Sequence, residues 1–90
     1  MARWIVIGTA PGWDDLTKFT AEMKPTGEWR VDPRTTVTTV TVLEDGRLLA
    51  ECHGSSKADL EPWFQKKGWR IESWTPIKHI AQAGDIWKVG

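Results

Sequence analysis

Residues 34–54, RTTVTTVTVLEDGRLLAECHG, contain two stretches that favour extended chain on either side of Asp45-Gly46. An Asp-Gly pair is typical of a two-residue type I′ turn, because glycine adopts a positive φ without steric cost. The stretch therefore predicts a β-hairpin whose strands meet at this dipeptide. In the register that such a turn imposes, Leu43 lies opposite Leu48.

A two-residue turn sorts the side chains of the hairpin into two faces, since successive residues of a strand point to opposite sides. One face carries mostly small or apolar side chains, and we expect it to contact helices: Val37, Thr39, Thr41, Leu43, Leu48, Ala50 and Cys52. The other face is expected to point outward: Thr38, Val40, Val42, Glu44, Arg47, Leu49, Glu51 and His53.

The residues before the hairpin predict a strand followed by a helix. Residues 3–9 are short and β-branched and end at a Pro-Gly turn signal. Apolar residues then recur at three- and four-residue steps, as on one face of a helix: Trp13, Leu16, Phe19 and Met23. Asp14 or Asp15 offers an N-cap carboxylate. Residues 28–34 are either an irregular lead-in or an extra piece of edge strand, because Pro33 cannot donate to a ladder.

The residues after the hairpin predict a second helix. Asp59 is the expected N-cap, because it places Pro62 in the first turn, where the missing N–H removes no intrahelical bond. Gly68 fits the left-handed position after the helix, and Trp69 can then contact Phe64, as in a Schellman ending.

The order of elements completes the predicted fold. Residues 70–80 read as a last strand that Pro76 confines to an edge or interrupts with a bulge. Residues 86–89 could turn back as a short extra C-terminal strand, within the chain or on a neighbour. The resulting βαββαβ order over residues 3–80 resembles a ferredoxin-like α+β domain, an antiparallel sheet with two helices on one face. We expect residues 1–90 to form one such domain.

The face of the sheet without helices is the predicted interaction surface. Val40, Val42 and Leu49 would form an apolar patch there and make this face more apolar than a solvent-exposed face needs to be. The chain is therefore expected to act by association, as a homo-oligomer or as a non-catalytic accessory subunit of a larger enzyme. Two copies paired through this face would resemble the dimeric α+β barrels.

An alternative function is an enzyme or binder for a small hydrophobic or aromatic compound. His53 would be its polar group, with Glu51 two residues earlier orienting the imidazole. Trp4 or Trp74 would form a wall of the site. The seven tryptophans of the chain leave two interpretations open, a core filled with aromatic rings or a stacking surface for a ligand.

Composition argues against several other classes. Twelve basic and twelve acidic side chains give zero net charge, which offers no general attraction for nucleic acid. The expected third strand, residues 47–53, also lacks the aromatic rings on which RNA-recognition domains stack bases. No segment approaches the roughly 20 apolar residues of a membrane span. One cysteine and two histidines predict no metal site and no cofactor, and suggest the cytoplasm.

Overall fold

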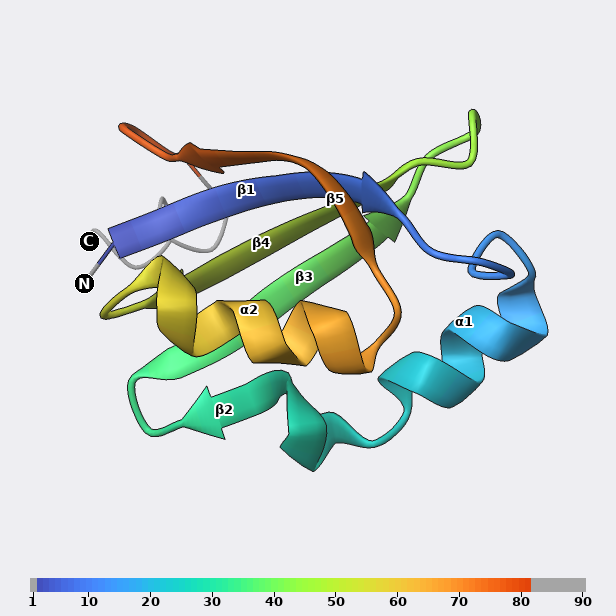
Figure 1. Ribbon diagram of the computed structural model, residues 1–90, viewed down its shortest axis with the longest axis horizontal. Helices are drawn as coiled ribbons and strands as arrows, with labels where there is room; N and C mark the ends of the chain where they lie inside the picture. Colours follow the sequence, from blue (N-terminus) through green and yellow to red (C-terminus); the bar gives the residue numbers. More distant parts are fainter. Residues whose placement is uncertain (1, 82–90) are drawn as a thin grey trace.

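Five antiparallel strands form one sheet in the order β2-β3-β4-β1-β5 (Figure 1). The structure of the protein, a computed structural model, describes residues 2–81, with the side chains at positions 26 and 28 left out. The strands are β1 (Ala2–Thr9), β2 (Arg30–Asp32), β3 (Thr35–Val42), β4 (Leu48–Gly54) and β5 (Arg70–Pro76). The helices are α1 (Leu16–Met23), the 3₁₀ helix η1 (Thr26–Trp29) and α2 (Lys57–Lys66). The α+β class is thereby confirmed.

The predicted ferredoxin-like order, with two helices on one face, is not matched. The short strand β2 extends the sheet beyond β3, so residues 28–34 contain an extra edge strand preceded by η1. Only α2 lies across the sheet, whereas α1 lies beyond its end (Figure 1). Asp15 caps α1 as expected and accepts a hydrogen bond from the Lys18 N–H at 3.1 Å. Leu16, however, is 75% exposed and does not join the core.

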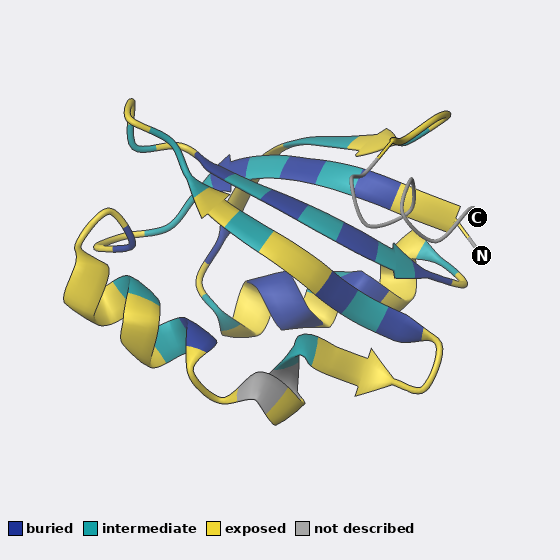
Figure 2. Cartoon of the chain, turned by 180° about the vertical axis from the view of Figure 1, so that it is seen from behind, coloured by how far each residue is buried: buried dark blue, intermediate teal, exposed yellow. Residues whose placement is uncertain are grey.

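The core lies between α2 and the two central strands, β1 and β4. Buried and half-buried residues alternate along both strands, as Figure 2 shows. This alternation is expected for a sheet covered on one side. The buried strand residues are Trp4, Val6, Leu48, Ala50 and Cys52, and α2 contributes Leu60, Trp63 and Phe64.

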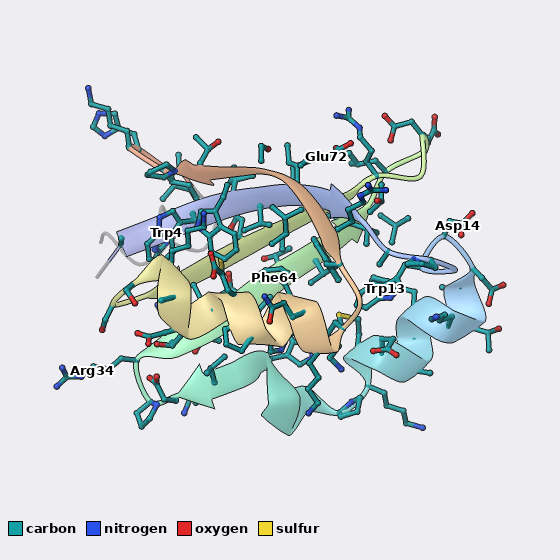
Figure 3. The ribbon with its side chains drawn as sticks, viewed as in Figure 1. Trp4, Trp13, Asp14, Arg34, Phe64 and Glu72 are labelled. Atoms are coloured by element: carbon teal, nitrogen blue, oxygen red, sulfur yellow. The ribbon has the colours of Figure 1, made fainter. Side chains whose placement is uncertain are left out.

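Aromatic rings form a continuous chain through this core. The successive ring centroids from Phe19 through Trp13, Trp69, Phe64 and Trp74 to Trp4 lie 6.2, 5.6, 4.9, 5.4 and 6.2 Å apart. Figure 3 places Phe64 between Trp4 and Trp13 along the length of the molecule. Trp4, Trp13, Trp69 and Trp74 therefore pack in or against the core, where each ring buries a large apolar area.

The turn between β3 and β4 differs from the predicted type I′ turn. The Leu43 N–H donates to the Arg47 carbonyl at 2.8 Å, and the Gly46 N–H donates to the Leu43 carbonyl at 3.0 Å. Gly46 has a φ of +88°, whereas Asp45, like every other described non-glycine residue, does not have a positive φ. A type I′ turn needs a positive φ at both central residues. The geometry is instead that of a type I turn followed by a left-handed glycine.

The loop between β3 and β4 is one residue longer than predicted, and this changes the face of the sheet on which two valines lie. Val42 lies opposite Leu48, and Val40 lies opposite Ala50. Cross-strand partners share a face, and Leu48 and Ala50 are fully buried. Both valines therefore pack against the core. The predicted outward orientation of Val40 and Val42 is wrong.

A β-bulge in β3 lets a third valine reach the same core. The register shifts between Val37 and Thr39, and Val37 lies opposite Cys52 with no exposed surface. Thr38 is the extra residue, and its Oγ1 donates to the Glu51 carbonyl at 3.1 Å. Such bulges insert one residue and restart the alternation of a strand in the opposite phase.

The N-terminus of α2 lies earlier than predicted, and its C-terminus is as predicted. Ser56 is the N-cap, so Pro62 lies inside the helix, and the prediction of Asp59 is wrong. Burial of the apolar side chains of α2 offsets the lost backbone bond. At the other end the Trp69 N–H donates to the Phe64 carbonyl at 2.9 Å, which confirms the Schellman ending.

The last described strand, β5, lies at the edge of the sheet, where its Pro76 is tolerated. The Ile77 N–H still donates to the Arg3 carbonyl at 2.8 Å, so the pairing with β1 continues one residue further. The predicted strand at residues 86–89 lies outside the described residues.

Candidate functional site

The surface of the sheet opposite α2, here called the open face, carries the candidate site. The β1–β4 ladder pairs Ile7 with Leu49 and Ile5 with Glu51. Their neighbours along each strand are buried under α2, so these side chains point the other way. Ile5, Ile7 and Leu49 are half-buried and together form an apolar patch on the two central strands. No described helix covers this patch (Figure 2).

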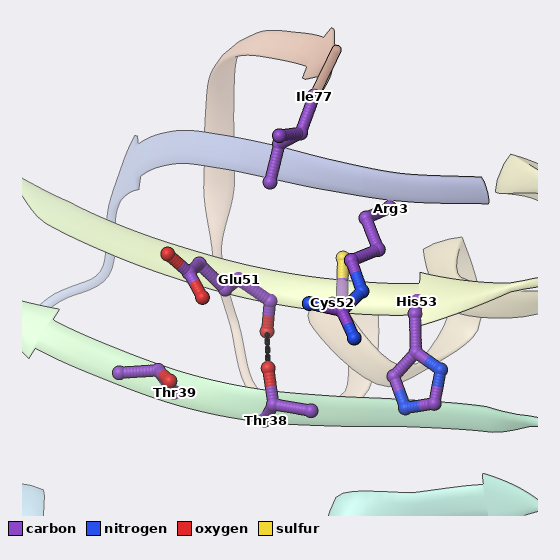
Figure 4. A pocket seen from close by; sticks show the side chains of 7 residues that line it. All are labelled: Arg3, Thr38, Thr39, Glu51, Cys52, His53 and Ile77. Carbon is purple, nitrogen blue, oxygen red and sulfur yellow. Dashed lines mark hydrogen bonds between the residues drawn. The ribbon is translucent and has the colours of Figure 1, made fainter. Parts of the chain in front are cut away.

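A pocket of about 260 Å³ opens at one end of this face. Figure 4 shows its lining, which comes from β1, β3, β4 and the residue after β5: Arg3, Thr38, Thr39, Glu51, Cys52, His53 and Ile77. The lining combines a cation, a carboxylate, an imidazole and two hydroxyl groups with one aliphatic side chain. This arrangement can bind a small polar molecule, or it can form the polar rim of an interface.

The structure brings the predicted pair Glu51 and His53 into this one pocket. They do not form the expected acid–base pair, because no hydrogen bond joins them within the described part of the chain. The Glu51 carboxylate and the His53 imidazole point to different sides of the pocket in Figure 4. The predicted orientation of the imidazole by Glu51 is therefore not realised in this structure.

The two tryptophans predicted as a wall of the site lie on the other side of the sheet. Trp4 lies opposite Cys52 and is 8% exposed, and Trp74 lies opposite Val6. Their rings contact each other at a centroid distance of 6.2 Å in the core. Strand alternation puts residue 4 on the opposite face from residues 3 and 5. The assignment of Trp4 and Trp74 to the site of His53 is therefore wrong.

Val40 and Val42 do not belong to the open face either, so Leu49 is the one residue of the predicted patch that lies there. The two valines line a groove of about 360 Å³ between β3 and α1, together with Trp13, Asp14, Leu16, Phe19 and Thr41. Sequence reasoning missed Ile5 and Ile7, which take their place on the open face. Strand alternation was the signal that could have identified them, because it puts Ile5 and Ile7 on one face and Trp4 and Val6 on the other.

Sequence reasoning also missed Arg3, the cation of the pocket. Arg3 lies opposite His53 in the ladder. Among residues 2–81, no carboxylate lies within 4.0 Å of its guanidinium, and no cation lies within 4.0 Å of the Glu51 carboxylate. The open face thus presents two charges of opposite sign that have no partner in the described part of the chain.

Cys52 borders the pocket, but its thiol points into the core. Its side chain is 2% exposed, and the Sγ lies 3.9 Å from the Trp4 carbonyl oxygen. Burial disfavours the charged thiolate and raises the pKa of Cys52 to about 12. At neutral pH this thiol is protonated, so it is not a nucleophile. No cluster of three or more His, Cys, Asp or Glu side chains suited to a metal ion occurs among the described residues.

Comparison of the chain with known protein families, curated proteins and solved structures gave no match. None of the described helices has the length and apolar character needed to span a membrane.

Proposed function

We propose that the chain is an association domain that binds a second copy of itself through the open face. The observation that supports this function is the apolar patch of Ile5, Ile7 and Leu49 on the uncovered side of the two central strands. Burying such a patch removes apolar area from water and stabilises a complex by roughly 25 cal/mol per Å² before the cost of association. Two sheets stacked in this way resemble the dimeric α+β barrels.

The small size of the described domain favours the same proposal. Residues 2–81 form a modest core, and small domains gain stability when a partner covers more of their surface. A protein partner of different sequence, such as the catalytic subunit of an enzyme, would use the same patch. The single cysteine, which can form no disulfide within the chain, supports a reducing compartment such as the cytoplasm as the expected location of this function.

The test compares two substitutions that introduce the same charge at different apolar positions. Leu49→Asp places a carboxylate in the patch and should dissociate the dimer. Leu16→Asp places it on α1, at a residue that is 75% exposed and far from the open face, and should leave the dimer intact. Equal masses of the two variants in light scattering would refute the proposal.

A second candidate function is the binding of a small aromatic or hydrophobic compound that carries polar groups, because His53 and Glu51 line one pocket and offer it polar contacts. The fluorescent aromatic anion 8-anilinonaphthalene-1-sulfonate is a suitable probe. His53→Ala should lower its binding several-fold, whereas Leu16→Asp, which changes the groove beside α1, should not. The opposite order of the two effects would place the probe outside the pocket and remove His53 from this function.

A further inference from the structure

Arg3 and Glu51 lie on two sides of Ile5 on the open face. Arg3 precedes Ile5 by two residues on β1, and Glu51 is the direct cross-strand partner of Ile5 on β4. Both charged side chains lack an ion-pair partner within residues 2–81, although they line the same pocket. A surface that carries a cation and a carboxylate beside one apolar residue can be complementary to a second copy of itself.

We infer that the dimer of the proposed function is an isologous pair in which Arg3 of each protomer binds the partner's Glu51. In a twofold dimer of stacked sheets the axis lies in the plane between them, so each contact occurs twice. An axis that passes beside Ile5, perpendicular to the line from Arg3 to Glu51, packs Ile5 against the partner's Ile5. It brings Arg3 to the partner's Glu51 twice, once on each side of the axis. This inference rests on the proposed function and specifies its register.

The same axis also matches other residues of the open face. On an ideal sheet, strands lie about 4.8 Å apart and residues rise about 3.4 Å along a strand. Ile77 lies beside Arg3 on the outer side of β1, because its N–H donates to the Arg3 carbonyl. With these spacings, the axis places Leu49 across from the partner's Ile77. The arrangement therefore pairs apolar side chains with apolar side chains as well as cations with carboxylates.

The ion pairs would fix the orientation of the dimer more than its affinity. An apolar patch alone can slide or rotate on a second patch, whereas a charge that meets a like charge is strongly unfavourable. Arg3 suits this role, because a guanidinium binds a carboxylate through two parallel hydrogen bonds. The steep crossing of strands that this axis implies corresponds to the orthogonal class of sheet packing.

Charge reversal tests the pairing directly. Arg3→Glu places two carboxylates in each contact, and Glu51→Arg places two cations there. Each single variant should dissociate about 100-fold more readily than the unmutated protein. An equimolar mixture of the two variants should dimerise again, because both contacts of the mixed dimer then join a cation to a carboxylate. The double variant Arg3→Glu/Glu51→Arg should also dimerise.

Sedimentation equilibrium of these proteins distinguishes the possible outcomes, with Lys18→Glu on α1 as the matched charge control. Monomeric unmutated protein would refute the proposed function together with this inference. A dimer that survives both single reversals, or single variants whose mixture stays monomeric, would overturn the inference and leave the proposed function standing. If a reversal unfolds the chain, Arg3→Gln, Glu51→Gln and their combination form a double-mutant cycle. Additive losses of affinity in that cycle would overturn the pairing.

Discussion

The Trp69 indole lies 4.9 Å from the Phe64 ring, between centroids, while the Trp69 N–H donates to the Phe64 carbonyl at 2.9 Å. One pair of residues therefore ends α2 and joins that helix to the aromatic chain in the core. Phe64 also contacts Trp74 of β5 at 5.4 Å. A fully buried ring thus connects the edge strand to the helix.

Truncation of Phe64 should therefore destabilise the fold severely. Phe64→Ala removes a ring with no exposed surface and should lower the free energy of unfolding by about 3–5 kcal/mol. Phe64→Leu retains most of the apolar volume and should cost clearly less. Denaturant unfolding followed by tryptophan fluorescence measures both losses. Similar small losses for the two variants would show that the ring is not central to the core.

The residue before Trp69 allows a test of the helix ending. Gly68 has a φ of +79°, and Gly68→Ala should cost about 1–2 kcal/mol because a Cβ is strained in that conformation. Gly27 lies in η1 with no atom within 4 Å of a built Cβ, so Gly27→Ala is the matched control. The control should change the free energy of unfolding by less than about 0.5 kcal/mol. Equal effects at both positions would contradict the assigned ending.

Deleting single threonines from β3 tests the β-bulge. Thr38 is the extra residue, so its deletion should give a regular strand in which Val37, Val40 and Val42 still face the core. Deletion of Thr41 from the regular part should reverse the facing of Val42 and unfold the chain. Thermal unfolding by circular dichroism compares the two deletions. A less stable Thr38 deletion would refute the bulge.

The thiol of Cys52 predicts how stability changes at high pH. Unfolded thiol ionises near its ordinary pKa of 9.0, whereas burial raises the folded pKa to about 12. Between these values the folded state keeps a proton that the unfolded state has lost, so the contribution to stability falls as pH rises. Urea unfolding at pH 8 and pH 10.5 should show a larger loss for the unmutated protein than for Cys52→Ala. Identical losses would show that the thiol is not shielded.

The α+β class and the C-terminal ending of α2 followed from local patterns, and these predictions hold. Gly68 after an amphipathic stretch indicates a left-handed ending whatever the tertiary context. The burial of Leu48, Ala50 and Cys52 also followed from simple alternation. Such features depend on a few neighbouring residues, which the sequence displays directly.

The predicted patch failed because its position depended on register. A three-residue loop in place of a two-residue turn shifts β3 by one residue, and one residue exchanges the two faces of a strand. The spacing of Val37, Val40 and Val42, three residues and then two, was the sign of a bulge. A strand that buries all three valines cannot alternate regularly.

The position of α1 beyond the end of the sheet could not be predicted from the sequence pattern either. Leu16 and Phe19 share a helical face by spacing, yet only the arrangement of the other elements decides whether that face reaches the sheet. The extra edge strand β2 follows α1 along the chain and widens the sheet beside β3. Tertiary placement of this kind is not encoded in the periodicity of one segment.

The mass of the unmutated protein in solution tests the central claim most directly. Multi-angle light scattering at several concentrations up to about 100 μM reports that mass without any substitution. Association through Ile5, Ile7 and Leu49 predicts twice the chain mass of 10.2 kDa, and the monomer mass for Leu49→Asp under the same conditions. A mass of 10.2 kDa for the unmutated protein at every concentration would contradict the proposal.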